Sequence, residues 1–358
     1  MPSRRGFVGG LLAAGMTPRL SWADAGAPAF LSAARQADGS FALAGVSADG
    51  RVLFRLPLPG RGHAATAHPK RPEAVAFARR PGTFALVLDC AKGTEIARLK
   101  APEGRHFYGH GVFSSSGQIL YTAENDYAQG RGVIGVWAAR SGYRRVGEFA
   151  SGGVGPHDIR LLPDQETLVI ANGGIETHPE SGRSKLNIPV MAPNLSYATL
   201  RGEVVERVRL PQAWHKNSIR HLAVSKGGTV AFAMQWQGDV GEHPPLLGLH
   251  RRGESIRLLT AGADEQARMK GYAGSVAISG DGGEVAISSP RGGLVHVFAI
   301  GSGALSGVVE MADVCGLGPA RGGFCVSAGT GDFGVISGGV LQRTASHEVQ
   351  WDNHLVAV

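Results

Sequence analysis

Four histidines recur at the start of short apolar segments that lie far apart in the chain. They are His110 in the stretch 109–114, His157 in 157–162, His221 in 220–225 and His354 in 351–358. Imidazole is the commonest metal ligand in proteins and needs no unusual pKa to bind zinc, copper or iron. A fold that brought these stretches together would create a transition-metal site from side chains that no local motif connects.

Two glutamates extend this candidate site. Glu73 precedes the apolar stretch 74–78, and Glu124 follows the stretch 119–122. Carboxylates at such positions could bind a hard or ferric cation, or form a general acid/base pair. We therefore expect a metal site made of His110, His157, His221, His354, Glu73 and Glu124. The alternative is that the histidines bond to the backbone of neighbouring strands and that the glutamates are solvated in loops.

The elements that would position these residues form an internal repeat with a period of about 40 to 50 residues, the range of β-propeller blades. Each repeat consists of a strand, a polar turn, a second strand and one or two more strands. Residues 112–122 and 276–287 show it clearly, with the turns Ser-Ser-Ser-Gly and Gly-Asp-Gly-Gly. Short hairpin turns use glycine because they need a positive φ. The sequence therefore predicts an all-β fold, a seven-bladed β-propeller.

The two ends of the chain look complementary. Residues 28–60 contain three strands without a motif strand in front of them, whereas residues 353–358 resemble a motif that stops after its first strand. A C-terminal strand that completes blade one would close the ring and remove the exposed sheet edges. The expected blades are 28–60 with 353–358, 73–99, 110–149, 157–210, 218–259, 275–309 and 314–344. The best candidate for a helix is 264–269.

The propeller topology also predicts one polar face. Connections between blades and connections between second and third strands open on the same side, and ligand sites prefer such mouths. The expected ligand or partner face contains Glu176, His178, Arg220, Asn125, Asp126, Trp236, Arg291, Trp351 and Asn353. The long loop 173–194 should lie over or beside the mouth, with Glu176 and His178 reaching in. Packing is the alternative role for the two tryptophans.

The N-terminus predicts export. Residues 3–8, Ser-Arg-Arg-Gly-Phe-Val, match the twin-arginine pattern, and an apolar segment 7–16 and small-residue cleavage options at 23–25 or 25–27 follow. We therefore expect a signal peptide over 1–25, a single propeller domain over 26–358, and a periplasmic location. No later apolar stretch is long enough to span a bilayer.

Composition and the absence of known catalytic motifs limit the kinds of function that the sequence supports. The net charge is +7, but the basic residues are scattered, so nucleic acid is not an expected partner. The sequence contains no nucleophile elbow, phosphate-cradling glycine loop, metalloprotease motif or haem attachment motif. Cys315 and Cys325 flank a turn and could form a disulfide, whereas Cys90 is expected to be free. The expected oligomeric state is a monomer.

With these motifs, the chain resembles an uncharacterised family of twin-arginine-exported bacterial seven-bladed propellers, often encoded beside imelysin-type iron-uptake proteins and a di-haem peroxidase-like protein. The matching stretches are RPEAVAF (71–77), FYGHGVF (107–113), YTAENDY (121–127), GRGVIGVW (130–137), ANGGIETHP (171–179), SIRHL (218–222), SPRGG (289–293) and WDNHL (351–355). The resemblance spans nearly the whole mature chain. It implies a context, iron acquisition, rather than a reaction.

The leading hypothesis is a periplasmic, non-enzymatic propeller that binds a transition metal (iron, copper or zinc) or a metal-carrying partner, with periplasmic iron-uptake proteins as its partners. One alternative is a metal-assisted hydrolase or lactonase-like propeller that uses Glu73, His110 or Glu124 around a metal-bound water. The other is a protein-interaction scaffold that binds a partner on the same face without metal.

Overall fold

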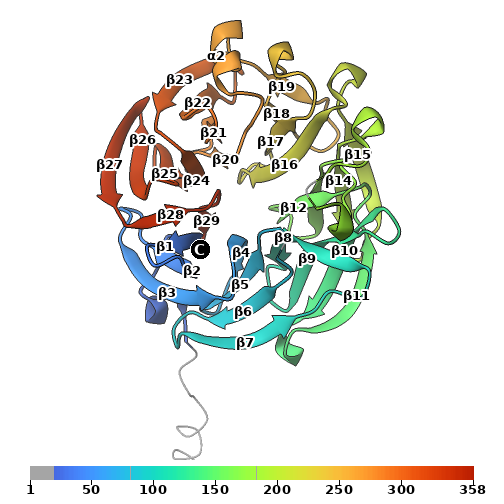
Figure 1. The fold of residues 1–358 in the computed structure, drawn as a ribbon, viewed down its shortest axis with the longest axis vertical. Coiled ribbons are helices and arrows are strands. Elements are labelled where there is room, and N and C mark those ends of the chain that lie inside the picture. The colour runs from blue at the N-terminus through green and yellow to red at the C-terminus, as the bar shows by residue number, and fades with distance from the viewer. Residues whose placement is uncertain (1–19, 81, 183) are drawn as a thin grey trace, which may run out of the picture.

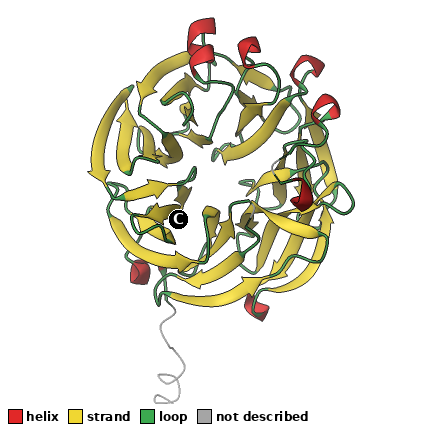
Figure 2. Ribbon diagram, in the orientation of Figure 1, coloured by secondary structure: helices red, strands yellow, loops and turns green. Residues whose placement is uncertain are grey.

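The computed structural model describes residues 20–80, 82–182 and 184–358, and within them seven antiparallel sheets are arranged in a ring (Figure 1). Strands form almost the entire ring, and short helical turns lie only in its connections (Figure 2). The predicted all-β, seven-bladed propeller is therefore confirmed. The expected signal peptide falls mainly on residues 1–19, which lie outside the described residues.

We name the blades A to G in chain order. Blade A contains β1 (Phe30–Gln36), β2 (Phe41–Val46), β3 (Val52–Leu58), β28 (Val349–Trp351) and β29 (Val356–Ala357). Blade B contains β4 (Gly62–Ala67), β5 (Glu73–Ala78), β6 (Ala85–Asp89) and β7 (Thr94–Leu99). Blade C contains β8 (Arg105–Phe113), β9 (Ile119–Asp126), β10 (Arg131–Ala138) and β11 (Arg144–Ala150). Blade D contains β12 (Pro156–Leu161), β13 (Thr167–Asn172), β14 (Asn194–Thr199) and β15 (Val204–Arg209).

In blades B to G the four strands follow one another in chain order from the axis outward, whereas in blade A the C-terminal strands β28 and β29 lie inside β1. Blade E contains β16 (Asn217–Val224), β17 (Val230–Trp236), β18 (Leu247–His250) and β19 (Arg257–Leu259). Blade F contains β20 (Ser275–Ile278), β21 (Glu284–Ser289), β22 (Leu294–Ala299) and β23 (Leu305–Glu310). Blade G contains β24 (Val314–Ala320), β25 (Gly323–Ala328), β26 (Asp332–Ser337) and β27 (Val340–Ser346).

Helical segments are short and peripheral. The 3-10 turns are η1 (Trp22–Ala25), η2 (Ala139–Ser141), η3 (Pro179–Ser181), η4 (Ile188–Val190), η5 (Gln212–Trp214) and η6 (Val240–Glu242). The helix predicted over 264–269 is found as α2 (Ala263–Arg268). In the described part of the chain, no helix has the length and apolar character needed to cross a membrane.

The chain closes its ring at blade A. Both β28 and β29 pair antiparallel with β1, with Ala34 opposite Trp351 and Leu31 opposite Val356. Figure 1 shows the C-terminal end inside the ring beside β1. The predicted closure is confirmed, but the position next to β1 is shared by two short strands, and His354 lies in the break between them.

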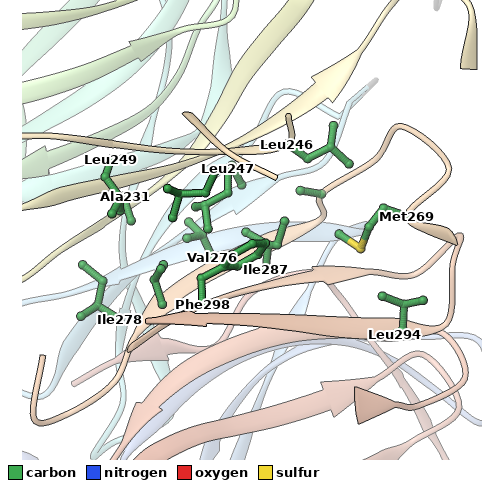
Figure 3. Close-up of a cluster of buried hydrophobic side chains, with 14 residues drawn as sticks. Ala231, Leu246, Leu247, Leu249, Met269, Val276, Ile278, Ile287, Leu294 and Phe298 are labelled. Carbon is green, nitrogen blue, oxygen red and sulfur yellow. The ribbon is translucent and has the colours of Figure 1, made fainter. Parts of the chain in front are cut away.

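The core lies between neighbouring blades. One apolar cluster joins blades E and F, where Leu247 and Leu249 of β18 pack with Val276, Ile287 and Phe298 (Figure 3). All five of these side chains are buried, and each contributes about 1.5–3 kcal/mol when it is removed from water. Strand pairing and packing between blades therefore hold the innermost strands in a fixed ring around the axis.

One expectation about local structure was wrong, and one open alternative is decided. Blade B begins at β4 rather than at Glu73, so Glu73 starts a second strand and not an axial one. Cys315 and Cys325 are both free thiols, as is Cys90. The hairpin contains an irregularity between Val314 and Leu317, and Cys325 therefore lies opposite Gly318 instead of Cys315.

Candidate functional site

The strand next to the axis is irregular in six blades; in blade G the irregularity contains Cys315, and in the five neighbouring blades A to E it lies at a histidine. Regular pairing is interrupted between Gly62 and Ala65 in β4, between Phe107 and Gly111 in β8, between Pro156 and Asp158 in β12, between Ile219 and His221 in β16, and between β28 and β29 in blade A. A histidine lies at each of these five irregularities. Bulges re-aim side chains, and they are over-represented beside functional sites.

These five histidines meet on the axis of the ring, and we call them the axial histidines. They are His63, His110, His157, His221 and His354, one from each of blades B, C, D, E and A. In nine of the ten pairs the ring centroids are 4.6–6.4 Å apart, and all five residues are at most 9% exposed. The structure thus brings together all four histidines of the predicted set and adds His63.

Two carboxylates face two of the rings, at Nδ1 of His110 and, without a hydrogen bond, at Nδ1 of His63. Asp158 Oδ1 lies 3.2 Å from Nδ1 of His110, and Asp352 Oδ1 lies 3.5 Å from Nδ1 of His63. A carboxylate at Nδ1 favours the tautomer in which that nitrogen carries the proton, which leaves a lone pair on Nε2. The Nε2 atoms of His63 and His110 face each other at 3.3 Å. If one ring carries its proton on Nε2, this contact is a hydrogen bond. If both rings carry the proton on Nδ1, the two lone pairs repel each other, and a shared cation would relieve this repulsion.

The carboxylates are themselves firmly held. Asp158 accepts hydrogen bonds from the backbone amides of Ile159 and Leu222, and it pairs with Arg160. Burial opposes its negative charge, but Arg160 and His110 outweigh this effect and hold its pKa below the ordinary value. The Asp158 carboxylate therefore stays charged in the folded protein and can keep the His110 ring in place.

The second carboxylate, Asp352, is bound in the same way. It pairs with Arg61 at 3.0 Å and with Arg79 at 2.8 Å. Burial again opposes the charge, and His63 and the two arginines together hold the pKa of Asp352 below its usual range.

Burial keeps four of the axial rings neutral. It lowers the pKa of His63 to about 4, although Asp352 acts in the opposite direction. Burial also lowers the pKa of His157, His221 and His354 well below 6.5, and the neighbouring imidazoles add to this shift. Neutral imidazole is the form that binds a metal, because a protonated ring has no free lone pair.

Several ring nitrogens lack protein partners. Among the described residues, Nδ1 of His157, Nδ1 of His221 and Nε2 of His354 are buried and have no hydrogen-bond partner. Burying a polar atom without a partner costs about 1–3 kcal/mol. For these three atoms, therefore, bonds to the backbone of neighbouring strands do not explain why the histidines are there.

The spacing of the nitrogens is close to that of a metal site. Two triads, His63–His110–His157 and His110–His221–His354, each offer nitrogens within 4.8 Å of one another. Two nitrogens at about 2.0–2.1 Å from one tetrahedral zinc lie about 3.3–3.4 Å apart. The pair formed by His63 and His110 already has this separation, whereas the other rings would have to move inward by about 1 Å.

The two glutamates of the predicted set lie elsewhere. Glu124 is completely buried inside blade C, where it accepts two hydrogen bonds from Arg145 at 2.7 and 3.0 Å and one from Thr122. Glu73 accepts a hydrogen bond from the Tyr143 hydroxyl and pairs with Arg71. Both residues lie on second strands rather than on axial ones, and their oxygens bond within blades B and C. The structure therefore does not bring them to the axial histidines.

One open cavity lies over the axial histidines, and we call it the mouth cavity. Its volume is about 440 Å³, and it is lined by His63, Arg79, Arg80, Tyr108, Gly155, His157, Gly173, Ile175, Thr177, Lys185, Arg220, His221, Gln235, Tyr272 and Asn353. A metal held by the axial rings could therefore be reached from outside. Three axial histidines form part of the wall, so the cavity and the cluster are one site.

The long loop 173–194 lies beside the mouth as expected, but with different side chains. Thr177 and Lys185 line the mouth cavity, whereas Glu176 and His178 do not. The His178 ring accepts a hydrogen bond from the Glu180 amide and packs edge-on against Tyr127. The expectation that Glu176 and His178 reach in is therefore corrected.

The other expected face residues divide into two groups. Arg220 and Asn353 line the mouth cavity, and Arg291 stacks its guanidinium 4.4 Å from the centre of the Tyr272 ring beside it. The rest make structural contacts. Asn125 donates a hydrogen bond to Thr177, and Asp126 forms ion pairs with Arg131 and Arg105. The indole N–H groups of Trp236 and Trp351 donate to the backbone carbonyls of Asp239 and Gly331. Packing, the alternative for both tryptophans, fits their positions.

The metal site expected from the sequence lacks His63, Asp158 and Asp352. A signal for His63 is present, since Gly62-His63 repeats the Gly109-His110 pattern, but the expected blade B begins only at residue 73. Asp158 and Asp352 lie next to predicted site residues in the sequence. Only the fold shows that Asp158 contacts His110 and that Asp352 contacts His63.

Comparisons with known proteins agree with the fold. The family model described as "Protein of unknown function (DUF1513)" matches residues 56–358. Among solved structures, Kuenenia stuttgartiensis hydrazine synthase is similar, with 14% sequence identity, a TM-score of 0.63, and coverage of 90% of this chain and 98% of that chain. At this identity the likeness shows the propeller fold alone. No curated protein sequence matches the chain.

Proposed function

The chain belongs to the DUF1513 family of proteins of unknown function, and we propose that its axial histidines bind a transition metal ion in a role accessory to iron uptake. Iron, copper and zinc all accept imidazole ligands. The observation that carries the proposal is the pair of Nε2 atoms 3.3 Å apart, each on a ring whose Nδ1 faces a buried carboxylate. A carboxylate behind a histidine is the usual outer shell of a metal ligand.

Burial supports the same conclusion. Five imidazoles from five blades lie together away from solvent, and His63, His157, His221 and His354 each present a buried nitrogen that has no hydrogen-bond partner among the described residues. Such a cluster costs stability unless a ligand uses the nitrogens. A metal bound by one of the two triads would offset part of this cost and would join three blades at their centre.

The arrangement favours binding over hydrolysis. Many metal-assisted hydrolases use a free carboxylate as general base beside the metal-bound water. The carboxylates nearest the axial histidines, Asp158 and Asp352, are already paired with arginines and hold imidazoles. Of the glutamates that the hydrolase alternative would use, Glu73 bonds to Tyr143 of the neighbouring blade C, and Glu124 bonds to Arg145 within blade C.

The cellular role rests on the resemblance to exported propellers encoded beside iron-uptake proteins. We place the protein in the periplasm, after export through the twin-arginine pathway, with periplasmic iron-uptake proteins as its partners. In this setting the propeller would hold a metal ion, or receive it from a partner, at the open end of its axis.

The proposal can be tested with protein purified without a histidine tag, stripped with a chelator and titrated with zinc, copper(II) and iron(II). We expect about one ion per chain and a higher melting temperature, because an ion at 100 times its Kd stabilises the folded state by about 2.7 kcal/mol. His110→Gln and His157→Gln should each abolish this stabilisation.

Two variants serve as controls. His243 is exposed in the loop of blade E and adopts a positive φ, so His243→Asn removes an imidazole elsewhere without backbone strain. Glu73→Gln removes a carboxylate of the predicted set. Both should bind metal as the unaltered protein does. If none of the three metals binds, or if His110→Gln and His157→Gln bind normally, the interaction scaffold is the better description.

A further inference from the structure

The mouth cavity above the axial histidines is lined by cationic side chains without acidic ones. Arg79, Arg80, Lys185 and Arg220 contribute to its wall, and no Asp or Glu of the described residues does. Arg291 lies beside it, in an adjoining cavity that shares Arg79, Tyr272 and Asn353 with the first. The cations come from blades B, E and F and from the long loop of blade D, so only the fold gathers them.

Most of this charge is not neutralised by the protein. Arg79 pairs with Asp352. In contrast, none of the carboxylates in the described part of the chain forms an ion pair with Arg80, Lys185, Arg220 or Arg291. Arg80 and Lys185 each donate only to a neutral oxygen, from Gly182 and Gln237 respectively.

Arg220 is the central group of this cavity. It occupies the irregularity of β16 beside His221, where the bulge turns it toward the mouth. Its Nε is buried and has no hydrogen-bond partner among the described residues. A guanidinium remains charged in such surroundings, so its donors need an acceptor. Lys185 experiences the same field: although the residue is exposed on its loop, partial desolvation and repulsion from Arg220 and Arg291 lower its pKa.

Neutral hydrogen-bonding groups complete the wall. The Tyr108 hydroxyl lies 3.2 Å from the Thr177 hydroxyl, and Asn353 and Gln235 provide amides. The volume of about 440 Å³ falls in the usual range for small-molecule sites. A cation alone would be repelled on its way to the histidines by Arg79, Arg80, Lys185 and Arg220. An anion, or a metal ion that carries anionic ligands, would be attracted.

We infer that the mouth cavity binds a small polyanion with several carboxylate or phosphate oxygens, anchored by Arg220 with Arg80 and Lys185. Guanidinium groups pair with both kinds of oxyanion through charge-assisted hydrogen bonds. The inference rests on the proposed metal site in one respect: if the axial histidines bind a metal, the polyanion would be the chelator with which that metal enters. The cationic wall and the unpartnered Arg220 do not depend on a metal.

The test uses the full chain freed of metal, with citrate and inorganic phosphate as separate probes in isothermal titration calorimetry at low ionic strength. We expect one of the two anions to bind and its affinity to fall steeply with added salt. Arg220→Gln should weaken binding at least tenfold, a loss of about 1.4 kcal/mol. Citrate as the tighter probe indicates a polycarboxylate, and phosphate as the tighter probe indicates a phosphorylated ligand.

Two further variants keep the test decisive. Lys185 is exposed on a loop, so Lys185→Gln should leave the fold intact and weaken binding even if Arg220→Gln fails to fold. Arg55 is exposed on β3 and lies outside the mouth, so Arg55→Gln should bind normally. The inference is overturned if neither anion binds, or if Lys185→Gln and folded Arg220→Gln bind as tightly as Arg55→Gln. If an anion binds but no metal does, the proposed metal site is refuted and the proposed anion site is supported.

Discussion

Acid should unfold the metal-free protein more readily than an ordinary propeller, and His63 gives the size of the effect. Its pKa is about 4 in the folded state, against 6.5 for an unperturbed histidine. The unfolded state therefore binds more protons below pH 6.5. The stability that the neutral ring contributes is present above this pH and is lost as the pH falls from 6.5 toward 4.

The loss between pH 7 and pH 5 can be worked out for this one residue. At pH 5 an unfolded histidine is almost fully protonated, whereas folded His63 is about one-tenth protonated, which corresponds to about 2 kcal/mol of lost stability. His157, His221 and His354 have their pKa values lowered by the same burial and add to the effect. His68 and His106, each with a pKa of about 4, lie outside the cluster and contribute as well.

A difference between variants isolates the axial contribution. Between pH 7 and pH 5, the free energy of unfolding of His63→Gln should fall by about 2 kcal/mol less than that of the unaltered protein, because glutamine does not titrate. The measurement is urea unfolding followed by tryptophan fluorescence at both pH values, in chelator and at fixed ionic strength. His243→Asn is the matched control and should lose as much as the unaltered protein. An equal loss in His63→Gln would show that this ring is protonated or solvated in the folded state, and the argument for a neutral ligand cluster would fail.

Three other predictions concern the closure of the ring, the buried glutamate and export. Deletion of residues 353–358 removes β29 and the buried side chains of Leu355 and Val356, so we expect the free energy of unfolding to fall by about 3–6 kcal/mol, or the protein to aggregate. Deletion of Val358 alone is the control and should have little effect. If the protein without 353–358 melts like the full-length protein, the role of β29 in closing the ring is refuted. Glu124→Gln leaves the charge of Arg145 without its buried partner and should cost about 3 kcal/mol in urea unfolding while metal binding stays normal. Loss of metal binding in this variant would return Glu124 to the site. Replacement of Arg4 and Arg5 by lysine should retain the precursor in the cytoplasm, and normal periplasmic accumulation in cell fractionation would contradict twin-arginine export.

The architecture could be predicted from the sequence because it is written in local patterns. The repeat of apolar strands and glycine turns recurs often enough to set the number of blades, and the incomplete motif 353–358 indicated where the ring closes. Closure of a ring then determines which strand starts face the axis. For this reason His110, His157, His221 and His354 could be placed together, although up to 244 residues separate them in the chain.

The details of the site depend on features that no local pattern encodes. A bulge shifts the two-residue alternation of a strand, so whether Arg220 or His221 faces a given side cannot be read from apolar spacing. Glu124 looked like a mouth residue by its position after a strand, yet Arg145 holds it inside blade C. The pairing of Glu124 with Arg145, which keeps Glu124 away from the mouth, forms only when the sheet is folded.

The charge balance of the mouth also belongs to the tertiary structure alone. Basic residues are scattered along the sequence, and their distribution indicated no site. The ring places Arg80, Lys185 and Arg220 around one cavity, while Asp158 and Asp352 bond to imidazoles and arginines below it. Electrostatic attraction and repulsion act through space over a few ångströms. The sequence by itself therefore determined the ring and four of its axial histidines, and only the fold decided which charges meet and which stay without a partner.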